Sequence, residues 1–177
     1  MTKEVKAALE ALRQAMGVEQ QGREFYLAAE QWTKDSNGKR LFRSIAADEE
    51  QHLHLIQVEY QRLSQGQTWA SAEEAKGEKP SGEVLVLFPP AKELANLITP
   101  DTTDLQALDL AIDFEGKGYQ MYGEMEAKTQ DTTGQAVYRY LAQQESKHQE
   151  VLQRTRDYLA SNGMWLFEEF ERPIFEG

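Results

Sequence analysis

Apolar residues recur at steps of three and four along four long segments of the chain, which is the period of an amphipathic helix. In the first segment Leu12 and Met16 share one face, and in the second Ile45 and Ile56 do the same. A capping-box pattern formed by Thr103 and Gln106 marks the start of the third segment. The four predicted helices cover residues 2–32, 38–64, 103–128 and 135–161.

Short polar turns join the first predicted helix to the second and the third to the fourth. The first turn contains Asp35 and Gly38, and the second contains Asp131 and Gly134. Short turns make each pair antiparallel, whereas the connection 65–102 is long enough to cross the bundle. We therefore predict an all-α, ferritin-like four-helix bundle over residues 1–163, made of two helical hairpins joined by a long crossover.

The crossover and the C-terminal tail are the less regular parts of the chain. Residues 65–102 hold four of the five prolines and the apolar run Val84–Phe88, for which we expect a short strand-like or helical piece of open role. The tail, 164–177, is rich in aromatic residues, and we expect it to pack on the bundle or on the partner in a homodimer. Its aromatic residues are Trp165, Phe167, Phe170 and Phe175.

Composition narrows the classes of function. The chain has 177 residues, 40% of them apolar and 28% charged, as in one soluble globular domain. The net charge of −11 disfavours nucleic acid and anionic membranes as partners. The lack of cysteine excludes disulfides, thiolate catalysis and cysteine-bound metals. No apolar segment has the length of a membrane span or the form of a signal peptide, so we expect a cytoplasmic protein.

The two hairpins are copies of one another at a fixed offset of 96 residues. Matching turns as well as matching helices indicate a duplicated unit, because helices of similar composition match by chance mainly in Ala and Leu. The residues that carry chemistry repeat in the same register. The pairs are Glu19 and Glu115, Glu49 and Glu145, His52 and His148, Gly22 and Gly118, and Tyr26 and Tyr122.

The repeated Glu and His positions have the pattern of a two-metal site. Glu49 and His52 are three residues apart and share one helix face, as do Glu145 and His148. Glu19 and Glu115 stand in the apolar stripes of their own helices, where an unpaired carboxylate would cost several kcal/mol. Four carboxylates neutralise two divalent cations, and oxygen and imidazole ligands suit iron and manganese. The predicted metal ligands are Glu19, Glu49, His52, Glu115, Glu145 and His148.

A single Glu-x-x-His on a helix is usually a solvated pair, so the prediction of a two-metal site rests on the duplication of the motif. Tyr26 and Tyr122 follow Glu19 and Glu115 by seven residues on the same face. We expect both to be core residues whose hydroxyls bond a ligand carboxylate, a position from which they could also supply an electron or a proton. Gly22 and Gly118 leave room for a substrate or for close approach of helices. Trp32, Trp69 and Trp165 are expected in the core or at an interface.

These motifs resemble the rubrerythrin branch of the ferritin-like superfamily. The resemblance implies two iron ions joined as Fe–O–Fe, a dimer or larger assembly, and reduction of hydrogen peroxide or dioxygen. Rubrerythrins usually carry a cysteine-bound rubredoxin domain as electron donor and an extra glutamate one turn after the third-helix ligand. Here the chain has no cysteine, and Gly118 takes the place of that glutamate. The resemblance rests on Glu19-x-x-Gly22-x-x-Phe25-Tyr26, Leu41-Phe42-x-x-Ile45-Ala46-x-x-Glu49-x-x-His52 and Leu141-Ala142-x-x-Glu145-x-x-His148.

Our leading hypothesis is therefore a di-iron oxidoreductase, a peroxidase or an oxidase, that takes electrons from an external donor such as a rubredoxin. Glu49 and Glu145 would bridge the two ions. A ferroxidase-like iron-storage protein, which would form cages, remains open. So do a di-manganese or mixed Fe/Mn protein and a metal-free helical scaffold.

Overall fold

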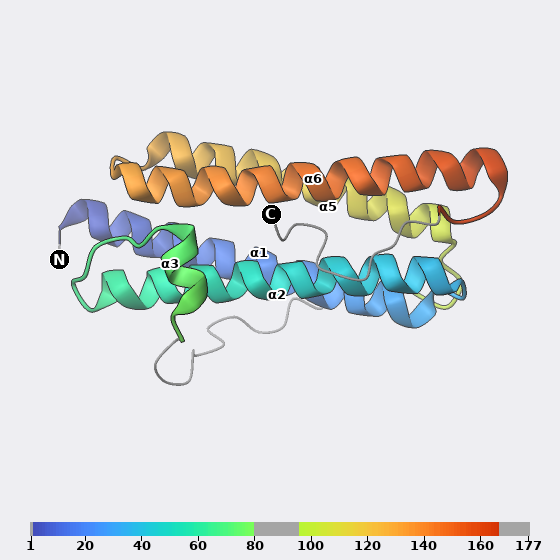
Figure 1. The fold of residues 1–177 in the computed structure, drawn as a ribbon, viewed down its shortest axis with the longest axis horizontal. Helices are drawn as coiled ribbons and strands as arrows, with labels where there is room; N and C mark the ends of the chain where they lie inside the picture. Colours follow the sequence, from blue (N-terminus) through green and yellow to red (C-terminus); the bar gives the residue numbers. More distant parts are fainter. Residues whose placement is uncertain (1, 80–95, 167–177) are drawn as a thin grey trace.

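The computed structural model describes residues 2–79 and 96–166 (Figure 1). Over these residues the chain forms the predicted ferritin-like bundle of four long helices, and the described part of the crossover adds one short helix. Within the described ranges no helix is long and apolar enough to cross a membrane. The helices are α1 Lys3–Trp32, α2 Ser36–Ser64, α3 Ala72–Gly77, α5 Asp104–Lys128 and α6 Thr132–Asn162.

Side-chain caps explain where the long helices begin and end. The carboxylate of Asp35 accepts hydrogen bonds from the backbone of Asn37 and Gly38, and Asp131 caps α6 in the same way. Because the aspartates are the N-caps, α2 and α6 begin two and three residues before the predicted starts. At the other end of α6, Gly163 adopts a left-handed φ of 69°, which only glycine takes without strain.

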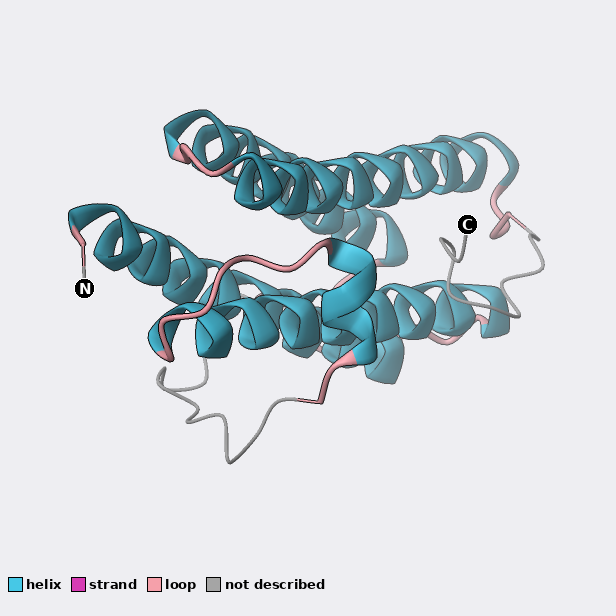
Figure 2. Cartoon of the chain, turned by 60° about the vertical axis from the view of Figure 1, so that its left-hand side comes forward, coloured by secondary structure: helices cyan, strands magenta, loops and turns pink. Residues whose placement is uncertain are grey.

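The hairpin α1–α2 lies beside the hairpin α5–α6 (Figure 1). Helix α2 ends at the opposite end of the bundle from the start of α5, so α2 and α5 point the same way. Helix α3 packs on α2 and reaches α6, across the outside of the bundle (Figure 2). The run Val84–Phe88 and the tail aromatics Phe167, Phe170 and Phe175 fall outside the described residues.

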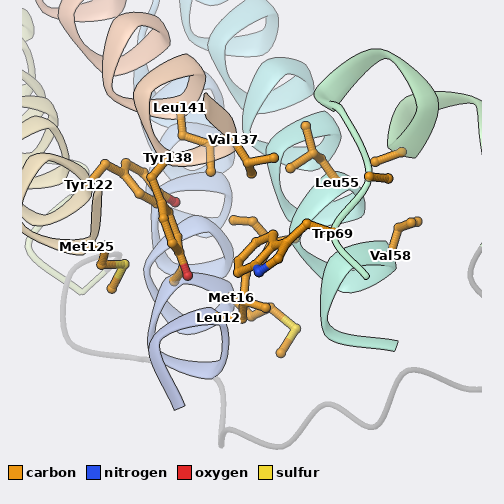
Figure 3. Close-up of a cluster of buried hydrophobic side chains, with 14 of the residues drawn as sticks. Leu12, Met16, Leu55, Val58, Trp69, Tyr122, Met125, Val137, Tyr138 and Leu141 are labelled. Carbon is orange, nitrogen blue, oxygen red and sulfur yellow. The ribbon is translucent and has the colours of Figure 1, made fainter. Parts of the chain in front are cut away.

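The apolar core is divided into two clusters, one on each side of the predicted ligands. One contains Leu12 and Leu55, and the other contains Phe25 and Ile45. Along α1 and α2 the ligand positions fall between these two groups of residues. Burial of both clusters holds the four helices together, and it keeps water from either end of the polar layer between them. Figure 3 shows the first cluster, which includes Trp69.

Glu59 is a buried carboxylate outside the predicted site. It lies on α2, and its oxygens accept a hydrogen bond from the backbone N–H of Ala70 at 3.2 and 3.3 Å. This bond fixes the first residues of the crossover against the bundle, beside Trp69. Burial raises the pKa of Glu59 from 4.5 to about 7, against the opposing effect of the Ala70 hydrogen bond.

The raised pKa of Glu59 makes its contribution to stability depend on pH. Between pH 4.5 and about 7 the folded chain keeps a proton that the unfolded chain has released, so this contribution falls as the pH rises through that window. Glu59→Gln cannot ionise. Its melting temperature, measured by circular dichroism, should therefore rise relative to that of the unchanged protein across the same window. Exposed Glu73→Gln is the control, and a constant difference between Glu59→Gln and the unchanged protein would contradict the assignment.

Candidate metal centre

The structure brings all of the predicted ligands together in the middle of the bundle, and all of them are buried. Each long helix contributes the residues that its sequence pattern predicts. Glu19 comes from α1, Glu49 and His52 from α2, Glu115 from α5, and Glu145 and His148 from α6.

The ligand atoms form two overlapping groups. One consists of Glu19, Glu49, His52 and Glu145, and the other of Glu49, Glu115, Glu145 and His148; within each, the ligand atoms lie within 4.8 Å of one another. Glu49 and Glu145 belong to both groups, so each can bridge two ions. The other four residues divide between the groups as one glutamate and one histidine each.

Both histidines turn the same ring nitrogen toward the carboxylates. His52 Nδ1 lies 3.4 Å from Glu19 Oε2 and 3.5 Å from Glu145 Oε1. His148 Nδ1 lies 3.3 Å from an oxygen of Glu115 and 3.4 Å from an oxygen of Glu49. The two rings are stacked with their centroids 5.7 Å apart. Each group therefore offers one imidazole nitrogen and several carboxylate oxygens directed at one point.

Several of these buried atoms have no hydrogen-bond partner among the described residues. They are Glu19 Oε2, both carboxylate oxygens of Glu49, His52 Nδ1 and Glu145 Oε1. Native proteins rarely leave buried polar atoms unpaired, because each costs about 1–3 kcal/mol. Their concentration in one cluster fits a site for metal ions, which would take up these lone pairs.

Burial and mutual repulsion oppose ionisation of the carboxyls of Glu49 and Glu145, which belong to both ligand groups. Burial raises the pKa of Glu49 to about 8, and it raises that of Glu145 well above its usual value, with the charge of Glu115 adding to the effect. Burial alone would lower the pKa of His52 and His148, but neighbouring glutamates raise both well above the usual value. These shifts favour the protonated forms of the cluster, and metal ions that bind there would displace protons.

Each predicted tyrosine bonds a ligand of the opposite hairpin. The hydroxyl of Tyr26 on α1 donates to Glu115 Oε1, and that of Tyr122 on α5 donates to Glu19 Oε1. Both tyrosines are completely buried. The bonds hold the carboxylates of Glu115 and Glu19 in place and tie the hairpins together at the level of the site.

Asp48 is a polar residue of the site that the sequence reasoning missed. It is buried on α2, one residue before Glu49, and its Oδ2 lies 3.3 Å from His148 Nε2. A carboxylate there would hold the ring with Nδ1 free for a metal. The sequence offered one signal for Asp48, because Asp48 has a polar counterpart, Gln144, at the repeat offset. Gln144 is buried as well.

The lack of a side chain at Gly118 makes room for the carboxylate of Glu145, a predicted metal ligand. A Cβ atom at this position would stand 2.6 Å from Glu145 Oε2, so even a methyl group would collide with the bridging carboxylate. A Cβ at Gly22 would instead meet the ring of Phe114 at 2.8 Å. The space at Gly118 is thus filled by Glu145, whereas the sequence suggested room for a substrate or a close helix.

A family comparison now agrees with this geometry. The model of the family described as Rubrerythrin matches residues 10–156, which include every predicted ligand. The chain belongs to the rubrerythrin family. A search of curated protein sequences finds no match.

Two solved structures of low sequence identity share the fold. A two-domain protein from Anabaena variabilis, with DJ-1/ThiJ/PfpI-like and ferritin-like domains, matches at a TM-score of 0.71 and 18% identity. That match covers 94% of this chain and 42% of the Anabaena chain, so this chain spans less than half of that relative. A hypothetical protein from Pyrococcus furiosus matches at 0.63 and 19% identity, over 89% of this chain and 93% of its own.

The contact at Gly118 predicts a specific sensitivity to substitution. Gly118→Ala should displace the Glu145 carboxylate and lower the number of metal ions bound per chain, measured by elemental analysis after loading and desalting. Gly123→Ala is the matched control on the same helix, because a Cβ there meets nothing within 4 Å. The control should keep its metal and gain about 0.5–1 kcal/mol of stability. Equal metal content in both variants would contradict the role given to Gly118.

The contact between Asp48 and His148 predicts a loss of affinity. Asp48→Asn keeps the shape of the side chain but removes its charge, and it should weaken binding of the more labile metal ion roughly 10- to 100-fold. Competition with a chelator under anaerobic conditions measures this change. Exposed Asp157→Asn on α6 is the control. Unchanged affinity in Asp48→Asn would show that the carboxylate does not support the ligand.

Proposed function

We propose that this rubrerythrin-family chain is a non-haem di-iron oxidoreductase that reduces hydrogen peroxide or dioxygen with an external electron donor. The observation that carries the proposal is the pair of overlapping, buried ligand groups that share Glu49 and Glu145. Four carboxylates balance two divalent cations, and the two neutral imidazoles complete an oxygen- and nitrogen-rich set that suits iron.

The residues divide into three roles in this proposal. Glu49 and Glu145 would bridge the two ions, Glu19 and His52 would complete one metal position, and Glu115 and His148 would complete the other. Iron supplies two electrons per ferrous pair, the number needed to split the O–O bond of a peroxide. Tyr26 and Tyr122 hold the terminal carboxylates, and the apolar clusters on both sides exclude water.

In this proposal the electrons come from an external donor, and the given sequence holds no cysteine that could bind an iron–sulfur or rubredoxin centre. A small one-electron carrier such as a rubredoxin has suitable chemistry. The same ligand set also suits manganese, so a di-manganese centre is the second candidate. Metal analysis of protein purified from its own source distinguishes the two.

Anaerobic loading followed by mixing with peroxide tests the proposal. We expect the two ligand groups to take up one ferrous ion each and the bound iron to become ferric within seconds of mixing, as followed by stopped-flow absorption. Glu145→Ala should lose bound iron and the fast reaction, because it removes a ligand from both groups. Exposed Glu150→Ala on the same helix should retain both.

Three results would count against di-iron reduction of peroxide. Oxidation no faster than that of free ferrous iron would exclude the proposed reaction. Mineral loading far beyond one ion per ligand group, in cage-sized particles by light scattering, would identify a storage protein instead. Unchanged metal content in Glu145→Ala would exclude the metal centre itself.

A further inference from the structure

Each half of the bundle contains a row of three aromatic rings that starts at a predicted metal ligand. In one row the rings of Tyr122 and Tyr138 are stacked, with centroids 6.4 Å apart and planes at 26°. Tyr138 then meets Trp69 edge-on at 5.6 Å. Figure 3 shows these three rings together in one buried cluster.

The other half contains the same row at the repeat offset of 96 residues. Tyr26 stacks on Phe42 at 6.2 Å and 27°, and Phe42 meets Trp165 edge-on at 5.8 Å. The distances and angles of the two rows nearly coincide. They differ chemically at one ring, since phenylalanine at position 42 corresponds to tyrosine at position 138.

The hydroxyl of Tyr138 is not explained by packing. It is buried and has no hydrogen-bond partner among the described residues, and burial raises the pKa of Tyr138. Phe42, at the equivalent position in the other row, shows that the packing there accepts a ring without a hydroxyl. An unpaired buried hydroxyl costs stability and calls for a reason outside packing, of which a redox role is one.

The chemistry of the three rings suggests that reason. Tyrosine and tryptophan can each give up one electron to a strong oxidant, whereas phenylalanine cannot at potentials reached in proteins. The inner end of the row touches the site, because the Tyr122 hydroxyl donates to Glu19 Oε1. The outer end, Trp69, is 9% exposed, while Tyr122 and Tyr138 are fully buried.

We propose that Tyr122, Tyr138 and Trp69 form a one-electron path between the metal centre and the surface, and that Phe42 interrupts the equivalent path in the other half. The path rests on the proposed function, which provides the oxidant. The path would also supply the further electrons that the ferrous pair does not hold. Reduction of dioxygen to water takes four electrons and the ferrous pair holds two, so two more must arrive singly.

Electrons and protons balance along the row. Tyr122 gives one electron to the oxidised centre while its hydroxyl proton shifts along the existing hydrogen bond to Glu19. Tyr138 restores Tyr122. Its hydroxyl has no hydrogen-bond partner among the described residues, and Glu59, whose charge acts on Tyr138, is the acceptor that we assign to its proton. Trp69 restores Tyr138 and is itself reduced by a one-electron donor in solution. Each proton returns when its tyrosine is reduced, so the protein is unchanged after each passage.

Radical transfer in the zinc-loaded full chain tests the path without metal redox chemistry, because Zn²⁺ has none. A short pulse of azide radicals oxidises tryptophan in preference to tyrosine, and absorption then follows conversion of tryptophanyl to tyrosyl radical. We expect a fast, concentration-independent phase in the unchanged protein. That phase should be lost in Tyr138→Phe and in Trp69→Phe.

The other half provides the matched control. Phe42→Tyr makes the reciprocal change in the equivalent row and should add a second fast phase. Retention of the original phase in Tyr138→Phe would overturn the path, as would the absence of a second phase in Phe42→Tyr. If Tyr138→Phe or Trp69→Phe fails to fold by circular dichroism, the gain in Phe42→Tyr decides. Loss of peroxide or dioxygen reduction with radical transfer intact would contradict the proposed function and leave the path standing.

Discussion

The structure depends on compensating four carboxyl groups that are buried at the centre of an otherwise apolar bundle. Glu19, Glu49, Glu115 and Glu145 are each at most 1% exposed. Unpaired, they would repel one another and oppose folding, as the raised pKa of Glu49 and Glu145 indicates. Apolar clusters lie on both sides of this layer, so the helices cannot part there to admit water without losing core contacts. Divalent cations are the simplest compensation for such a group of carboxylates.

Duplication accounts for most of the site, and the exceptions to it are informative. Ligands and their tyrosines repeat in both hairpins, so each metal position receives the same set of groups. The residues around them do not all repeat. Asp48 faces His148, but its counterpart is the neutral Gln144. Glu59, which binds the crossover, corresponds to Thr155, whose buried hydroxyl lacks a partner among the described residues. The two halves thus share a ligand set and differ in the electrostatic surroundings of each metal position.

The sequence was sufficient for the helices, the topology and the set of residues that meet. The helical period and the turn lengths predict two antiparallel hairpins, and the offset of 96 aligns their Glu and His positions. The sequence could not predict which side chains contact one another across different helices. Periodicity places Tyr26 on the same face as Glu19, yet its hydroxyl bonds Glu115 of the other hairpin. Asp48 was missed for the same reason, because its partner is 100 residues away on α6.

The space beside Gly118 connects packing to the chemistry of the family. The rubrerythrin resemblance implies a glutamate at this position that exchanges with a histidine when the iron changes oxidation state. Here Glu145 Oε2 would lie 2.6 Å from a Cβ, so no side chain fits while Glu145 keeps its place. His52 Nδ1 lies 3.4 to 3.8 Å from the carboxylates of Glu19, Glu49 and Glu145 and has no hydrogen-bond partner among the described residues. Exchange between a carboxylate at position 118 and a histidine would therefore first require the Glu145 carboxylate to move.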